Sequence, residues 1–297
     1  MVNIRLNYCN TLIFSIFVIL YVGNVYFSYL KEEQIIMSEN NTFKMLIRPA
    51  FFVPNIADRF NDDRRVHSIA YGKCNYRCAF CPFDKWTVDE YPEYTLETFE
   101  QKVWELLRYS KNFKFTGGEP TLNPLLPDLL KIVKIYGAQT FLDTNGSFPN
   151  KLRALINEDL VDIVGISLKG LSAEESAATA RITNKKLAWD NVFESIKIAS
   201  EAKDVSLIIT YVACEGYFKE SDLDVLADLL KPYPDVTLKI NNCYYEEYND
   251  GRRKGLDKSE IYAMVERFVE RHPEFRGRTV LFRDHDSCID QDQIAMF

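Results

Sequence analysis

Two kinds of segment alternate along most of this chain, and their alternation limits the fold more than any other feature of the sequence. From about residue 66, short runs rich in β-branched and aromatic residues are followed by longer stretches with apolar residues at helical spacing. This order is typical of βα units, whose parallel strands form one sheet covered by helices. Six such units predict an α/β fold with a partial (β/α)6 barrel of parallel strands. The predicted strands are 67–71, 111–115, 139–143, 161–168, 205–212 and 236–240, and the predicted helices are 96–109, 125–136, 189–202 and 222–230.

Length and composition allow one large domain. With 297 residues, of which 47% are hydrophobic, the chain can bury one sizeable core. We expect a core domain at 60–245 and a C-terminal extension at 246–297, with a helix at 259–271 and a strand at 279–282, that packs on the barrel. The formal charge of -7 argues against nucleic acid as a partner, because contacts with a phosphate backbone need clustered Lys and Arg.

Residues 1–36 contain an apolar segment that we leave out of the fold prediction. Residues 11–30 are almost wholly apolar and about long enough to cross a bilayer. They predict either a single N-terminal membrane anchor or a misassigned start, with translation truly beginning at Met37. We expect the catalytic domain in the cytoplasm, with membrane attachment only if residues 11–30 are translated and inserted.

Three cysteines share one short loop directly after the first predicted strand. Cys74, Cys78 and Cys81 form a Cys-x3-Cys-x2-Cys pattern. A structural zinc ion or a four-iron cluster normally takes four protein ligands. Three thiolates therefore suggest a metal group with one position open for a substrate.

The other four cysteines share no short spacing, so the chain does not look like a disulfide scaffold. Free thiols suit a reducing compartment. We expect Cys214 and Cys243 to be small buried residues on or after strands, which is the usual place of a lone cysteine. The remaining two are Cys9 and Cys288.

The cysteine loop resembles the cluster loop of radical S-adenosylmethionine (SAM) enzymes, in which three cysteines hold a [4Fe-4S] cluster. A second motif supports the resemblance, because residues 116–120 match the Gly-Gly-Glu-Pro loop that holds the methionine end of SAM. Both motifs follow predicted strands, at the edge that carries the active site in α/β barrels. The resemblance implies a radical SAM core that binds one [4Fe-4S] cluster and SAM.

The resemblance also implies roles for individual residues. Gly117 and Gly118 would let the backbone approach the amino group of SAM, where a Cβ atom would block it. Glu119 would offer an acceptor near that cation, and Phe80 would lie near the adenine. Lys169, at the end of the fourth predicted strand, would approach the SAM carboxylate.

A third motif indicates one subfamily. Residues 143–146, Asp-Thr-Asn-Gly, resemble a segment of the activating enzymes for glycyl radical enzymes, notably pyruvate formate-lyase activating enzyme. The resemblance makes Asn145 and Ser167 candidate cofactor-binding residues. Three positions depart from that pattern: Ser167 replaces an aspartate of a cation site, Thr210 replaces an arginine, and 241–245 lacks a histidine.

These motifs predict a radical SAM enzyme that cleaves SAM reductively and abstracts hydrogen from a substrate. We expect the substrate to be a glycine of a partner glycyl radical enzyme, and the electron donor to be a protein such as flavodoxin or ferredoxin. One alternative is a small-molecule or nucleobase-modifying enzyme similar to the 7-carboxy-7-deazaguanine synthases. Another is a non-catalytic zinc-binding module, with His67, His272 or His285 as the fourth ligand.

Overall fold

The computed structural model describes residues 42–51, 65–81, 90–243, 254–282 and 294–297. Residues Phe43–Phe297 form one compact unit. The predicted apolar segment at 11–30, the alternative start at Met37, and the side chains of His285, Cys9 and Cys288 lie outside the described residues. Within the described ranges, no helix is both long enough and apolar enough to cross a bilayer.

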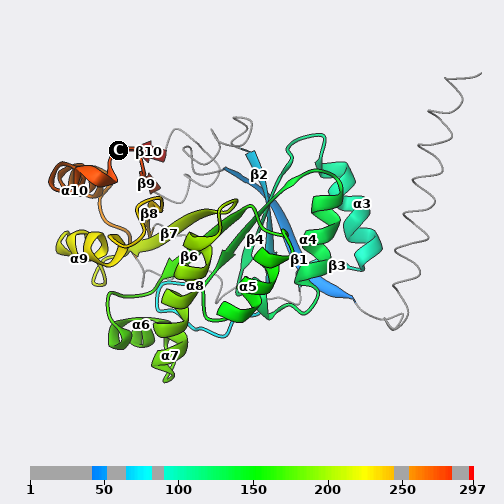
Figure 1. The fold of residues 1–297 in the computed structure, drawn as a ribbon, viewed down its shortest axis with the longest axis horizontal. Coiled ribbons are helices and arrows are strands. Elements are labelled where there is room, and N and C mark those ends of the chain that lie inside the picture. Colours follow the sequence, from blue (N-terminus) through cyan, green and yellow to red (C-terminus); the bar gives the residue numbers. More distant parts are fainter. Residues whose placement is uncertain (1–41, 52–64, 82–89, 244–253, 283–293) are drawn as a thin grey trace, which may run out of the picture. The chain divides into compact units, whose positions relative to one another are not determined.

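One sheet contains all ten strands of the described residues, in the order β10-β9-β8-β7-β6-β5-β4-β2-β1-β3 (Figure 1). Its central strands pair in parallel, as βα units require. The six predicted strands are all present and lie side by side in their order along the chain. The parallel strands are β2 (Arg65–Tyr71), β4 (Asn112–Gly117), β5 (Gln139–Thr144), β6 (Ile163–Leu168), β7 (Ser206–Ala213), β8 (Thr237–Asn242) and β9 (Thr279–Phe282).

The edges of the sheet differ from the prediction. The strand predicted at 279–282 in the C-terminal extension is β9; it pairs in parallel with β8 and extends the sheet, with Leu238 opposite Thr279. Three antiparallel strands at the two ends of the sheet were not predicted: two of them have only two and three residues and carry little periodic signal, and the third lies before residue 66, where the regular alternation begins. They are β1 (Phe43–Phe51) beside β2, β3 (Glu93–Tyr94) beside β1, and β10 (Ile294–Met296) beside β9.

The predicted helices are present. The first of them begins at Thr95, whose side chain accepts a hydrogen bond from the Thr98 backbone N–H, as an N-cap residue does. The helices predicted from apolar spacing are α3 (Leu96–Leu106), α4 (Leu126–Ile135), α8 (Asp190–Glu201), α9 (Ser221–Leu230) and α10 (Lys258–Arg271). Three helices were missed, because their sequences are polar or rich in alanine: α5 (Pro149–Asn157), α6 (Ala173–Ala180) and α7 (Lys185–Ala188). Two short 3-10 turns are Pro120–Leu122 and Pro273–Phe275.

The two faces of the sheet differ in polarity. On β7, Leu207, Ile209 and Tyr211 belong to the main hydrophobic core, together with apolar residues of the helices. The residues between them point to the other face, where Ile208 is buried and Thr210 is half-buried. This second face carries a smaller apolar cluster and half-buried polar side chains such as those of Lys114 and Thr210, and we call it the inner face.

Candidate functional site

The cysteine loop, residues 72–81, begins where β2 ends. Its backbone is fixed by the C-terminal turn of α6: the N–H groups of Arg77 and Ala79 donate to the carbonyls of Ala180 and Thr179, each at 2.9 Å. The Arg77 side chain also donates to the Cys74 carbonyl at 2.8 Å. The loop is therefore held against α6 at the C-terminal edge of the sheet, the edge predicted for it.

The three loop cysteines lie in one apolar cluster. Cys78 is buried, and Cys74 and Cys81 are partly buried beside it. Cys214 and Cys243 belong to the same cluster and are fully buried, which confirms their prediction as buried residues after strands. Among the described residues, five cysteines therefore lie in or against this cluster, three from the loop and two from the ends of β7 and β8.

The thiols of the loop influence one another. Burial raises the pKa of Cys78 to about 11; Lys169 opposes this shift, and the neighbouring Cys81 and Cys74 add to it. Among the described residues, no three Cys, His, Asp or Glu side chains already converge in the arrangement of a metal site. The donor set, three neighbouring soft sulfur ligands in a water-poor cluster, nevertheless fits a thiophilic iron group.

The two described histidines lie in other surroundings. The Nε2 atom of His67 lies 3.0 Å from the Leu106 carbonyl oxygen, and its ring packs against Phe113. The Nε2 atom of His272 lies 2.9 Å from an oxygen of Asp224. Both side chains are thus engaged by other groups, which weakens the zinc alternative for these two positions.

The glycine loop contacts the cysteine loop directly. The N–H of Gly118 donates to the Tyr71 carbonyl at 2.5 Å, and the N–H of Glu119 donates to the Lys73 carbonyl at 2.7 Å. A Cβ atom at Gly118 would lie 2.1 Å from the Lys73 carbonyl oxygen. Gly117, with a φ of +102°, would place a Cβ atom 2.5 Å from Tyr71. Both glycines are therefore needed for the close contact between the two loops. The sequence did not reveal this reason for glycine at the two positions.

The Glu119 carboxylate lies fully buried behind this junction. It accepts hydrogen bonds from the backbone N–H and hydroxyl of Thr121, the hydroxyl of Thr144 and the backbone N–H of Asn145. Burial raises the pKa of Glu119, and the bonds from Asn145 and Thr121 oppose that shift. Glu119 thus joins the ends of β4 and β5.

Asn145 also connects loops. Its side-chain amide donates to Asn75 in the cysteine loop at 2.8 Å, and Asn75 donates to the Ser147 hydroxyl at 2.9 Å. Ser147 in turn donates back to the Asn145 side-chain oxygen at 2.6 Å. These bonds join the cysteine loop to the loop after β5.

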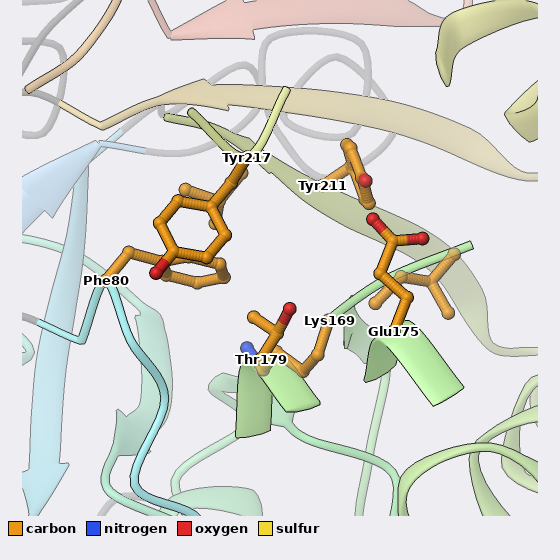
Figure 2. Close-up of a pocket in the computed structure, with 8 residues that line it drawn as sticks. Phe80, Lys169, Glu175, Thr179, Tyr211 and Tyr217 are labelled. Atoms are coloured by element: carbon orange, nitrogen blue, oxygen red, sulfur yellow. The ribbon is translucent and has the colours of Figure 1, made fainter. Parts of the chain in front are cut away.

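Phe80 and Lys169 line a small hollow beside the cysteine loop (Figure 2). The Lys169 Nζ atom lies 5.8 Å from the Phe80 ring centroid, and Tyr217 packs edge-on against the same ring at 6.3 Å. Glu175 and Thr179 of α6 and Tyr211 of β7 complete the wall that Figure 2 labels.

Sequence reasoning missed four of these wall residues. Glu175 and Thr179 were missed because the alanine-rich α6 was not predicted. Tyr211 was part of a predicted strand and gave no separate signal. Tyr217 is 46% exposed and lies shortly after the end of β7. The sequence signal that could have found it is an aromatic residue just beyond the end of a predicted strand.

Ser167, a predicted cofactor-binding residue, is half-buried on the inner face of β6, opposite Thr210 of β7.

Comparison with known proteins agrees with this geometry. A sequence model of the Radical SAM superfamily matches residues 68–230, more than half of the chain. Molybdenum cofactor biosynthesis protein 1 of Dictyostelium discoideum is 26% identical over 237 residues, which cover 76% of this chain and 35% of that protein. An S-adenosylmethionine-dependent nucleotide dehydratase of Flammeovirga pacifica is 32% identical over 120 residues, 37% of this chain and 40% of that protein.

A putative glycyl-radical enzyme activating enzyme of Methanocaldococcus jannaschii is 27% identical over 128 residues, 41% of this chain and 46% of that protein. The chain thus spans less than half the length of each of these relatives. The solved structure described as native anSMEcpe with bound AdoMet has a TM-score of 0.52 and 21% identity, over 68% of this chain and 57% of that one. That likeness establishes a shared fold, the partial α/β barrel.

Proposed function

Because the chain belongs to the radical SAM superfamily and is an enzyme, we propose that it binds SAM beside a [4Fe-4S] cluster and uses the resulting radical on a small molecule. Cys74, Cys78 and Cys81 would hold the cluster. When bound there, the cluster supplies an electron that cleaves SAM and yields a 5'-deoxyadenosyl radical. The protein's own contribution is to bind, orient and exclude water.

One observation carries this proposal: the cysteine loop and the glycine loop meet through two backbone hydrogen bonds at the C-terminal edge of the parallel strands. Lys169 and Phe80 lie next to them and line the hollow. An ammonium group suits the carboxylate of SAM, and an aromatic ring suits its adenine. Gly117, Gly118, Glu119, Asn145 and Ser167 would then shape the binding surface, four of them through the contacts described above.

We place the small-molecule substrate ahead of a protein glycine. Two of the relatives reported above are named for cofactor biosynthesis and for nucleotide dehydration, and one is named for the activation of a glycyl radical enzyme. The chain's departures at Ser167 and Thr210 from the activating-enzyme pattern support the same order. Activation of a glycyl radical enzyme, with flavodoxin or ferredoxin as electron donor, is the second candidate, supported by the Asp-Thr-Asn-Gly segment.

The test is an anaerobic reconstitution with iron and sulfide, followed by incubation with SAM and a reductant. We expect about four irons per chain and formation of 5'-deoxyadenosine. Cys74→Ala, Cys78→Ala and Cys81→Ala should each abolish both. Cys214→Ala is the matched control, because it removes a buried thiol of the same apolar cluster and should keep the iron content.

Two outcomes count against parts of this proposal. A reconstituted protein that binds zinc but no iron, and never cleaves SAM, would contradict the radical function. Faster formation of 5'-deoxyadenosine with nucleotides would support a small substrate. An electron paramagnetic resonance doublet on a glycyl radical protein, with no response to small molecules, would instead support the second candidate.

A further inference from the structure

We propose that a negatively charged electron-carrier protein docks on a basic face beside the cysteine loop. The basic face consists of exposed side chains from the loop, from the C-terminal end of α6 and from α7: Arg77, Arg181, Lys185 and Lys186. The inference rests on the proposed function in one respect, because reductive cleavage of SAM needs an external electron. One electron passes from the reduced carrier to the cluster, so the carrier is oxidised, the cluster is reduced and no atom is transferred.

The two segments that form the basic face differ in charge from the rest of the chain. The chain as a whole has a formal charge of -7, with 43 acidic and 36 basic residues. Residues 72–81 and 176–189, in contrast, contain neither Asp nor Glu, and their basic residues are Lys73, Arg77, Arg181, Lys185 and Lys186. A local excess of positive charge on an acidic protein favours a negatively charged partner at this surface.

Hydrogen bonds bring these two segments together. The Arg77 backbone N–H donates to the Ala180 carbonyl at 2.9 Å, which places Arg77 close to the next residue, Arg181. The Tyr76 hydroxyl donates to the Leu187 carbonyl at 2.7 Å and so holds α7 on the cysteine loop. Helices α6 and α7 lie side by side (Figure 1). The four cations therefore share one surface, although they are about 100 positions apart in the sequence.

Most of this positive charge is not neutralised within the part of the chain that the structure describes. Lys185 pairs with Glu174 at 2.6 Å, where the two side chains are 55% and 71% exposed. The Arg77 guanidinium donates to two backbone carbonyls of the cysteine loop at 2.8 Å each, which orient the group without cancelling its charge. Among the described residues, no ion pair joins Arg181 or Lys186 to a carboxylate.

The basic face lies on the outer side of the loop that carries the thiols. Arg77 is exposed, whereas its neighbours Tyr76 and Cys78 are only 2% and 7% exposed. A carrier bound at Arg77 would therefore lie next to a cysteine that would hold the cluster, and electron transfer between proteins needs such a short separation. Complexes of electron-transfer proteins bury small interfaces, and attraction between opposite charges speeds their association, so a small charged face suits this partner.

The experiment measures binding of oxidised flavodoxin, a negatively charged carrier, to the reconstituted protein by calorimetry at low ionic strength. Lys185→Glu/Lys186→Glu should raise the dissociation constant by about tenfold or more, and added salt should reduce the difference. The variant should fold, because Glu is favoured in the first turn of a helix. Lys203→Glu/Lys231→Glu is the matched control: it makes the same change in net charge at exposed positions near the opposite edge of the sheet, and should stay within about twofold of the native value.

Electron delivery is measured on the same preparations. With a low concentration of reduced flavodoxin, Lys185→Glu/Lys186→Glu should form 5'-deoxyadenosine about tenfold more slowly than the native protein, whereas with excess dithionite the two rates should be equal. No 5'-deoxyadenosine from the native protein with excess dithionite would refute the proposed function, and calorimetry tests the docking separately. If flavodoxin does not bind, if it binds the variant and the native protein equally, or if only a short RNA oligonucleotide binds the basic face, the inference is wrong.

Discussion

At the scale of single residues, the glycine loop contributes to the structure independently of any cofactor, because it packs closely against the cysteine loop. Gly118 lies so close to the Lys73 carbonyl that no side chain fits, and Glu119 behind it has all its described hydrogen bonds directed into the protein. Substitutions here should therefore disturb the junction of two loops as well as ligand binding. Stability and SAM affinity must be measured together.

Gly118→Ala should destabilise the protein by more than about 2 kcal/mol, because the new Cβ atom would collide with backbone, which cannot rotate away. Urea denaturation measures the change. Gly137→Ala is the control: Gly137 also has a positive φ, but nothing lies within 4 Å of its Cβ position. That control should cost about 1–2 kcal/mol, the strain of a left-handed backbone alone. Equal losses in both variants would refute the steric explanation.

At the scale of elements, α9 and α10 are joined by a network of ion pairs. The Glu220 carboxylate accepts from Arg267 at 2.6 Å and 3.0 Å and from Arg271 at 3.2 Å, while Arg271 also binds Asp224. The hydrogen bond from Arg267 is the largest cause that lowers the pKa of Glu220 to about 2, and Arg271 adds to it. The network is at the surface, so its contribution to stability is small.

The lowered pKa gives a pH dependence with a defined sign. The unfolded chain has a Glu pKa of about 4.3. The contribution of Glu220 is therefore fully present above about pH 5 and is lost as the pH falls through about 2. At pH 7, Glu220→Gln should lower the melting temperature by about 1–3 °C.

The difference between Glu220→Gln and the native protein should shrink between pH 5 and pH 2, which parallel thermal scans would measure. Glu201→Gln, at an exposed position on α8, is the control and should show little change at any pH. A difference that grew as the pH fell would contradict the assigned ion pairs.

At the scale of the whole molecule, Phe43–Phe297 form one compact unit that contains the sheet, the cysteine loop and the glycine loop. Deletion of residues 1–36 should therefore leave iron content and SAM cleavage unchanged, because none of the described site residues lies in the removed part. The measurement compares truncated and full-length protein after identical reconstitution. A truncated protein that fails to fold or bind iron would show that the first 36 residues contribute to the unit.

The sequence by itself determined the central sheet and the place of the chemistry. Strands β2 and β4–β8 were predictable because a parallel strand buried between layers is a short run of β-branched and aromatic residues between turns. The cysteine loop was predictable because its three cysteines are close in sequence. The structure places this loop directly after β2, as predicted. The pairing of the two motifs also identified the superfamily.

Only the tertiary structure determined how those motifs contact one another. The hydrogen bond from Asn145 to Asn75 joins residues 70 positions apart, and the contact of Gly118 with Lys73 depends on two neighbouring strands ending at the same level. Likewise, Lys114 and Lys239 share a face with Asp143 only because of the register of strands β4 to β8. Such contacts follow from packing between distant segments, and local periodicity records only which side of an element is buried.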